Sequence, residues 1–165
     1  MNKIQKEPIR KKAFLICLAG MDSIVNSNTG QVLVQAQQCL QQLERVSNLM
    51  VVTDENVRIA YAQWNSYHLP HCTMISTRNK TLTQVIAELL NLEYERKKVL
   101  VVGFGTDIVQ QAQQSGVLFY PILPNEAPAC WSMLLQESAL KLLHGTYQGE
   151  YQRQLLARHH TALPK

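Results

Sequence analysis

Val99-Leu100-Val101-Val102-Gly103 is the stretch of this chain that indicates its fold. A short run of aliphatic, mostly β-branched residues that ends in glycine is typical of a strand buried on both faces of a parallel sheet. Similar apolar runs occur on either side of it, at residues 13–19, 48–53, 72–76 and 117–122. The sequence therefore predicts five buried strands.

Between these runs lie segments whose apolar residues recur at helical spacing. In residues 82–92 the apolar positions share one helical face, and Thr81 can cap the helix. Further helices are predicted over residues 31–46, 107–114, 128–143 and 147–157, with another beginning near Asp54. Because strand and helix alternate, we expect an α/β fold, a three-layer α/β/α sandwich around a parallel Rossmann-like sheet.

Composition and charge exclude several classes of protein. The 165-residue chain is 46% hydrophobic and 17% charged, which excludes a disordered chain or a coiled coil. Its net charge of +4 comes from residues 1–12, which carry five cations and one carboxylate. A nucleic-acid-binding fold carries its basic excess on the folded body. We therefore expect a basic tail at 1–12, a single domain at 13–162, and no nucleic-acid partner.

The four cysteines and the apolar runs bear on the compartment. Cys17, Cys39, Cys72 and Cys130 are scattered without a Cys-x-x-Cys pair, so we expect reduced thiols and a cytoplasmic protein. No apolar run approaches the roughly 18 residues of a membrane span, so no membrane partner is expected. The basic start followed by the apolar residues 13–19 also fits a secretion signal, but no small-residue cleavage site follows Met21.

Residues that follow four of the predicted strands share a pattern with one enzyme family. The segment Ala19-Gly20-Met21-Asp22-Ser23-Ile24-Val25-Asn26-Ser27 follows the first strand, Thr53 ends the second, Lys80 precedes the helix at 82–92, and Val101-Val102-Gly103-Phe104-Gly105-Thr106-Asp107-Ile108 includes the end of the fourth strand. In order and spacing they resemble the four motifs of the haloacid dehalogenase-like phosphohydrolases. The segments 116–122 and 145–151, with Trp131, resemble the C-terminal end of a phosphatase-like branch of that family.

The resemblance implies a chemistry that these residues cannot perform. In the family, one aspartate attacks phosphorus, a second acts as acid and base, motif-four carboxylates help to hold Mg²⁺, and a Thr and a Lys bind phosphoryl oxygens. This chain has Ala19 and Met21 in place of the two aspartates and Phe104 in place of a motif-four carboxylate. Loss of a nucleophile alone costs a hydrolase about a millionfold. We therefore expect a catalytically inactive homologue, with no catalytic residues and no Mg²⁺ cofactor, and with Phe104 intruding on the metal position.

Three residues of the former site remain able to hold an anion. Ser23, Thr53 and Lys80 could bind a phosphate-like ligand without turnover, helped by the helix that follows Thr53. The alternative is that Thr53 only caps the helix beginning near Asp54 and that Lys80 is a solvated lysine. Asp54 and Glu55 weigh against an anion because they carry like charge.

A second function uses the carboxylates that are present. Asp22, Asp54 and Asp107 each follow a different strand, so they could converge at one sheet edge and support an active hydrolase with altered chemistry. The simpler interpretation is that they are solvated loop acids. His68-x-x-His71-Cys72 fits no closed zinc pattern and is expected to be an ordinary loop, and His159-His160 is expected to be solvated.

The length of the first connection bears on the partner. About a dozen residues separate the first strand from the first helix, too few for an inserted cap domain. An uncovered sheet edge favours a protein partner over a small metabolite, and a homo-oligomer is possible. We expect Trp131, Leu134, Leu135, Tyr147 and Tyr151 to pack the terminal helices on the sheet; an apolar patch left exposed there would be a partner surface.

Overall fold

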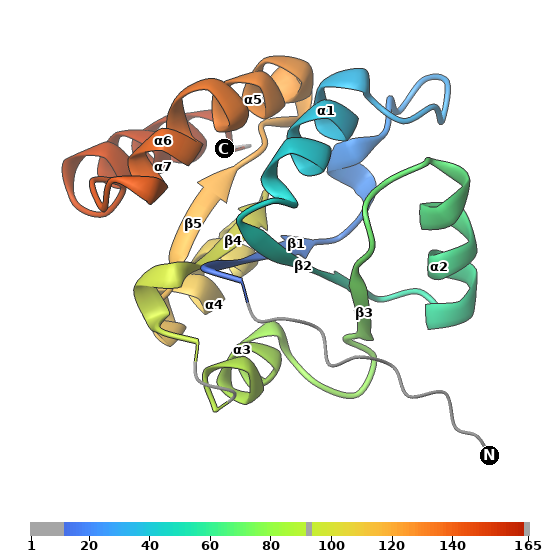
Figure 1. Ribbon diagram of the computed structural model, residues 1–165, viewed down its shortest axis with the longest axis horizontal. Coiled ribbons are helices and arrows are strands. Elements are labelled where there is room, and N and C mark those ends of the chain that lie inside the picture. The colour runs from blue at the N-terminus through green and yellow to red at the C-terminus, as the bar shows by residue number, and fades with distance from the viewer. Residues whose placement is uncertain (1–11, 92–93, 164–165) are drawn as a thin grey trace.

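The sheet predicted from the apolar runs is present. The computed structural model describes residues 12–91 and 94–163 (Figure 1). Five parallel strands form one sheet in the order β3-β2-β1-β4-β5. They are β1 (Phe14–Ala19), β2 (Ser47–Thr53), β3 (Thr73–Ser76), β4 (Val99–Gly103) and β5 (Leu118–Pro121). All carboxyl ends therefore meet at one edge.

Helices cover both faces of the sheet. They are α1 (Val34–Leu43), α2 (Val57–Ser66), α3 (Leu82–Leu90), α4 (Thr106–Ser115), α5 (Ala127–Met133), α6 (Ala139–Leu143) and α7 (Glu150–Ala162). In Figure 1, α1, α5 and α6 lie on one face, α3 and α4 lie on the other, and α2 lies beside β3. Shorter turns are η1 (Asp22–Ile24), η2 (Arg96–Lys98), η3 (Pro124–Glu126) and the π-helical η4 (Leu134–Ser138). The predicted three-layer α/β/α sandwich is confirmed.

Alternate residues of β1 build the two cores. Ile16 and Leu18 belong to the cluster that includes α1 and α5, whereas Leu15 and Cys17 belong to the cluster that includes α3 and α4. This division follows from the two-residue repeat of a strand. A strand that is apolar at every position therefore has both faces buried, as the sequence predicted.

Two predicted helix starts are wrong. The helix expected over 31–46 begins only at Val34 because Val32 forms an antiparallel bridge with Val25. The helix expected near Asp54 begins at Val57, where the Asn56 side chain accepts hydrogen bonds from the N–H groups of Arg58 and Ile59. Thr53 is therefore not its cap.

The C-terminal region departs from the predicted bounds in a different way. The predicted helix 128–143 is a continuous helical run made of α5, η4 and α6, and the last helix covers Glu150–Ala162 instead of 147–157. Trp131, Leu134 and Tyr147 are buried in the core and Leu135 and Tyr151 pack against it, as expected.

The connection between β1 and α1 stays short. Residues 20–33 form η1 and the Val25–Val32 bridge, so no cap domain is inserted among these described residues. The carboxyl edge next to β1 is therefore not covered by a cap at this connection.

Several sequence expectations concern the chain ends and the thiols. The predicted tail 1–12 and the alternative signal segment lie outside the described residues up to residue 11. All four cysteines are free and buried, and burial raises the pKa of the Cys17, Cys39 and Cys72 thiols to about 12. These thiols are therefore protonated near neutral pH and are poor nucleophiles. Among the described residues, no helix combines the length and hydrophobicity that crossing a bilayer requires.

Candidate functional site

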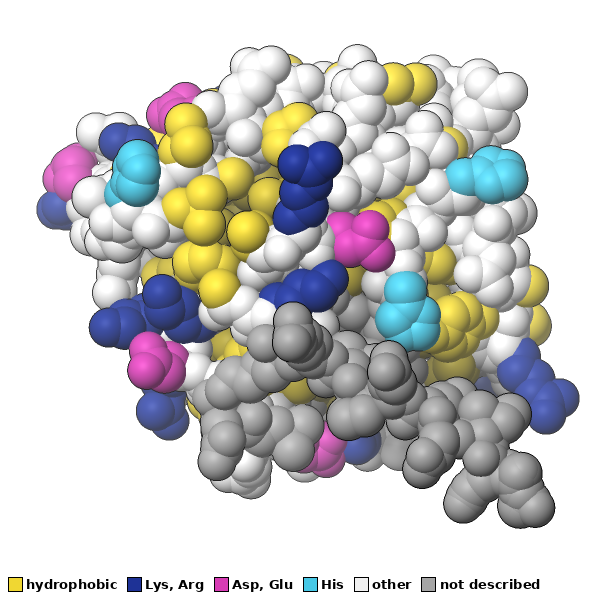
Figure 2. Space-filling model, viewed as in Figure 1, with side chains coloured by type: hydrophobic (Ala, Val, Ile, Leu, Met, Phe, Trp, Pro, Cys, Tyr) yellow, Lys and Arg dark blue, Asp and Glu magenta, His cyan; other side chains and the backbone are white. Residues whose placement is uncertain are grey.

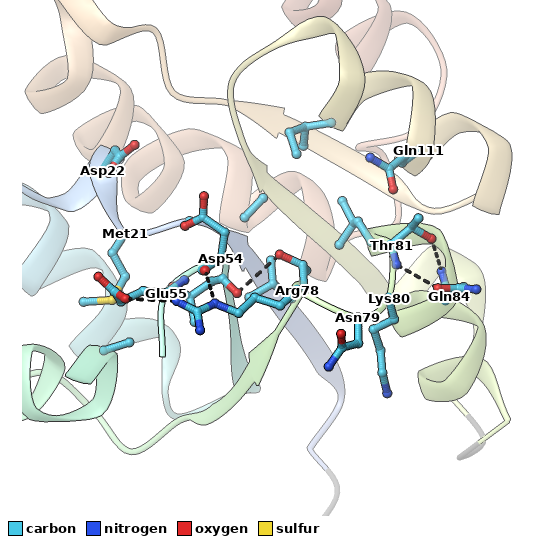
Figure 3. Close-up of a pocket in the computed structure, with 18 of the residues that line it drawn as sticks. Met21, Asp22, Asp54, Glu55, Arg78, Asn79, Lys80, Thr81, Gln84 and Gln111 are labelled. Atoms are coloured by element: carbon cyan, nitrogen blue, oxygen red, sulfur yellow. Dashed lines mark hydrogen bonds and ion pairs between the residues drawn. The ribbon is translucent and has the colours of Figure 1, made fainter. Parts of the chain in front are cut away.

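A cleft of about 790 Å³ opens at the carboxyl ends of β1, β2 and β3 (Figure 3). Ala19, Gly20 and Val52 line its base between the strands, and Leu82 and Ile108 contribute apolar surface from α3 and α4. The remaining wall is rich in uncharged polar side chains that can form hydrogen bonds, namely Thr53, Gln63, Thr77, Asn79, Thr81, Gln84 and Gln111. This mixture of an apolar base and polar walls suits a binding site.

The cations of the cleft already have partners. Arg78 lies 3.5 Å from the Glu55 carboxylate, and its Nε donates a hydrogen bond of 2.9 Å to the Asp54 carbonyl oxygen. Lys80 forms an ion pair of 3.0 Å with Glu88. Both pairs are partly exposed, so each is worth no more than about 1 kcal/mol. Even so, a bound phosphate would have to compete with these carboxylates for each cation.

Two carboxylates of the cleft have no cationic partner. Asp22 and Asp54 line the cleft and form no ion pair with any described residue. Figure 3 shows both on the same side of the cleft, with Lys80 on the opposite side. The unbalanced charge of this site is therefore negative, which disfavours the predicted anion ligand.

Thr53 and the start of α3 already take part in local hydrogen bonds, although a hydroxyl that accepts a hydrogen bond can still donate its own proton. Thr53 is buried, and its hydroxyl accepts a hydrogen bond of 3.0 Å from the Glu55 N–H group. The start of α3 is closed by a capping box in which Thr81 and Gln84 satisfy each other's backbone N–H groups. Thr53 and Lys80 do line one cleft, as predicted, but Ser23 does not.

The cap of α2 gives a stability prediction. We expect Asn56→Ala to lower the free energy of unfolding by about 1 kcal/mol, because two N–H groups at the helix start lose their acceptor. Chemical denaturation measures the change. Asn79→Ala, on the cleft wall outside any helix, is the matched control and should change stability by less than about 0.5 kcal/mol. Equal losses in the two variants would contradict this account of the cap.

Of the three residues that stand in place of carboxylates in the resemblance, two line the cleft, and none of the three side chains is a carboxylate. Ala19 ends β1 at the base of the cleft, and its methyl group lies 3.1 Å from where a side chain at Gly103 would begin. Met21 lines the cleft and also packs against the core. Phe104 does not line the cleft: its ring packs on His159, 4.8 Å between ring centroids. Phe104 instead lines a second cavity together with Ala19, so its expected intrusion on a metal position stays a prediction.

A second cavity of about 550 Å³ adjoins the cleft. It shares Ala19 and Asp22 with the cleft and is lined further by Ser23, Phe104 and Pro128, among others. The Ser23 carbonyl accepts a hydrogen bond of 2.8 Å from Trp131 Nε1, while the Ser23 hydroxyl is buried without a partner among the described residues. Ser23 therefore belongs to this cavity, separated from Thr53 and Lys80.

The three predicted acids do not form one site. Asp22 and Asp54 share the cleft, but Asp107, in the first turn of α4, does not line it. Within the described residues, no three His, Cys, Asp or Glu side chains gather closely enough to hold a metal ion. The relocated hydrolase site therefore lacks one of its proposed members.

The loop between α2 and β3 behaves as an ordinary loop. Trp64 Nε1 donates to the Pro70 carbonyl, and Gln41 donates to that of His68, which has a positive φ of 55°. These contacts explain the conformation of the loop at residues 68–72 without a metal ion.

One prediction about a histidine is wrong. His159 is only 3% exposed, and its Nε2 accepts a hydrogen bond of 3.0 Å from the Gly105 N–H group in the turn between β4 and α4. His160 is exposed, as expected. The signal that sequence reasoning missed is the spacing of four between Leu155 and His159, which places both on the buried face of a helix.

Some apolar surface remains exposed on the helical layer. Figure 2 shows hydrophobic side chains gathered on the face formed by α1, α5 and α6, with lysine and arginine side chains near them. On α6, Leu140 and Leu143 are 53% and 48% exposed. Trp131 and Tyr147 are buried, as expected, so they contribute nothing to this exposed surface.

Comparison with known proteins adds no relative. The chain matches no protein-family model, and the curated proteins include no significant match. The fold and the site define a parallel α/β protein with a polar cleft at the carboxyl edge of its sheet.

Proposed function

We propose that this protein is a catalytically inactive, haloacid dehalogenase-like protein that binds a segment of a partner protein in the cleft. Three segments that resemble the family's motifs contribute Ala19, Thr53 and Lys80 to that cleft. The observation that carries the proposal is the methyl group of Ala19 at its base. That position needs a nucleophile for phosphoryl transfer.

The other groups of the cleft do not replace the missing chemistry. A substitute nucleophile would need a neighbouring base that activates it. The Thr53 hydroxyl instead accepts a hydrogen bond from a backbone N–H group, and Asp107 lies outside the cleft. Mg²⁺ prefers several oxygen ligands, and among the described residues only Asp22 and Asp54 offer unpaired carboxylates here.

The charge and shape of the cleft favour a basic protein segment over a phosphate. Arg78 and Lys80 are matched by Glu55 and Glu88, which leaves Asp22 and Asp54 to attract a cation. A lysine or arginine side chain can pair with them and donate to the amide oxygens of the wall. The absence of a cap over residues 20–33 leaves room for a macromolecule.

A phosphate-ester assay tests the absence of turnover. We expect the full chain with Mg²⁺ to release no phosphate from a panel of phosphate esters above the rate without protein. Three carboxylates of the family's mechanism are absent, and loss of the nucleophile alone costs about a millionfold. Release that Asp22→Asn or Asp107→Asn abolishes at unchanged stability would overturn the proposal in favour of relocated chemistry.

Thermal unfolding with inorganic phosphate separates the two kinds of ligand. Binding to the folded state raises the melting temperature, and we expect phosphate to raise it no more in the wild type than in Lys80→Ala. The control is Lys97→Ala in η2, outside the cleft. A rise that Lys80→Ala removes and Lys97→Ala keeps would replace the protein segment by a phosphate-bearing ligand.

A further inference from the structure

The last helix is tied to the candidate site by one buried hydrogen bond. Gly105, in the turn between β4 and α4, donates its N–H to His159 Nε2 at 3.0 Å. The imidazole makes edge contacts with Phe104, at 4.8 Å, and with Phe119, at 5.7 Å between ring centroids. The ring thus lies between the turn and β5, with only 3% of the residue exposed.

This geometry fixes the protonation state of the ring. A nitrogen that accepts a hydrogen bond carries no proton, so His159 is neutral with its proton on Nδ1. A second proton would make both ring nitrogens donors, and the Nε2–H and Gly105 N–H groups would then face each other. Protonation of His159 and the contact to the turn therefore exclude each other.

The surroundings of the ring favour the neutral form. Burial lowers the pKa of His159, and the charge of His160 lowers it further. The turn and β5 present Phe104, Gly105 and Phe119, none of which is acidic or basic. On α7 itself, Arg158 is paired with Glu126 at 3.8 Å. Among the described residues, no carboxylate is paired with the ring.

The turn held by His159 connects both cavities. Gly103 and Phe104 line the second cavity, and Ile108 and Gln111 of α4 line the cleft. The Gln111 side-chain oxygen also accepts from the Thr83 N–H group at the start of α3. A displaced turn would therefore move walls of both cavities.

We propose that His159 is a positioning residue that acts as a proton-sensitive latch. The neutral imidazole holds the turn between β4 and α4, and protonation in mildly acidic solution releases it. The consequence for binding rests on the proposed function of the cleft, whereas the latch itself does not. No bond other than the hydrogen bond to Gly105 is broken, and the proton comes from solvent.

Nuclear magnetic resonance of the ¹⁵N-labelled full chain tests the latch without any ligand. As the pH is lowered from about 8, we expect the Gly105 amide signal to shift with the same midpoint as the His159 ring. That midpoint lies below the one of an ordinary histidine, because burial lowers the pKa of His159. Its protection against hydrogen exchange should fall about tenfold, as for a lost hydrogen bond. The Thr77 amide, which donates to the Thr53 carbonyl beside the ends of β2 and β3, should keep its protection.

Two variants separate the latch from general stability. His159→Gln retains an acceptor for the Gly105 N–H group but does not titrate, so the pH response of the turn should disappear. His160→Gln should retain the response with a higher midpoint, because it removes the charge that lowers the pKa of His159. A proton on His159 Nε2 near neutral pH, seen in the ring ¹⁵N shifts of the wild type, would overturn the proposal.

Equal loss of protection at Gly105 and Thr77 would also overturn it, since that result means global unfolding. An unchanged pH response of the Gly105 amide in His159→Gln would likewise overturn the proposal. None of these outcomes depends on the cleft's ligand, whereas release of phosphate from an ester would refute only the proposed function.

Discussion

Replacing Trp131 with alanine is expected to lower the free energy of unfolding by about 3–5 kcal/mol. The side chain is fully buried in the layer of α1 and α5. Its indole Nε1 donates a 2.8 Å hydrogen bond to the Ser23 carbonyl, which lies 108 residues away in the chain. Trp131→Ala therefore leaves a cavity and also an unpaired carbonyl in η1, next to both cavities of the candidate site.

Equilibrium unfolding in urea measures this loss. Trp131→Phe is the matched control because it keeps most of the buried ring and removes only the N–H donor. Its cost should be about 1–3 kcal/mol, smaller than that of the alanine variant. A cost below about 1 kcal/mol for Trp131→Ala, too small for a cavity in a packed core, would contradict the packing described for α5.

Gly105→Ala is expected to lower stability by about 1–3 kcal/mol. The φ and ψ angles of Gly105 are 118° and 151°, in a region that only glycine adopts without strain. An alanine there would push the chain toward another conformation and displace the N–H group that His159 accepts. The variant should therefore also expose His159 and bring its pKa closer to the value of a solvated histidine.

Gly145 is the control for backbone strain at Gly105. Its φ is 73°, and a side chain added there would meet no described atom within 4 Å. Gly145→Asn should cost less than about 1 kcal/mol, because asparagine tolerates left-handed backbone better than alanine does. The two variants are compared by thermal unfolding at neutral pH. Equal costs at positions 105 and 145 would mean that the turn between β4 and α4 is not specially constrained.

The fold could be predicted from local patterns in the sequence. Strands such as Val99–Gly103 are buried on both faces, so they are apolar at every position and easily recognised. The start of α3 was predicted equally well, because Thr81 caps the helix as expected through neighbouring backbone groups. Gln84, which completes the capping box, was not predicted. The start of α2 was missed by three residues, since Thr53 and Asn56 can both cap a helix and only Asn56 does so here.

The candidate site was less predictable because its properties depend on pairs distant in sequence. The strand-end rule correctly directed attention to Thr53 and Lys80, which line one cleft. It could not indicate that Glu88 neutralises Lys80, that Ser23 faces another cavity, or that Asp107 lies outside the cleft. Nor could it place His159 against Gly105, a contact across 54 residues that only the packing of α7 creates.

These pairs change the expected ligand. Taken singly, Lys80 and the helix starts favour an anion. Lys80 and Arg78 are matched by carboxylates and the helix starts are capped. Within residues 12–91 and 94–163, the charges of the cleft that remain without an ionic partner are those of Asp22 and Asp54. The unpaired charge of the cleft is therefore negative, which favours a cationic ligand over the anion expected from the sequence.

The central claim is tested most directly by a peptide selection. Random heptapeptides displayed on phage are selected for binding to the immobilised full chain. Peptides retained by the wild type and lost with the double variant Asp22→Asn, Asp54→Asn are the ones that use the cleft, and Asp107→Asn is the control that should retain them. We expect these peptides to be enriched in lysine and arginine, and their binding to weaken as salt is raised. Enrichment in aspartate and glutamate, or no peptides that depend on Asp22 and Asp54, would contradict a cleft built to bind a basic protein segment.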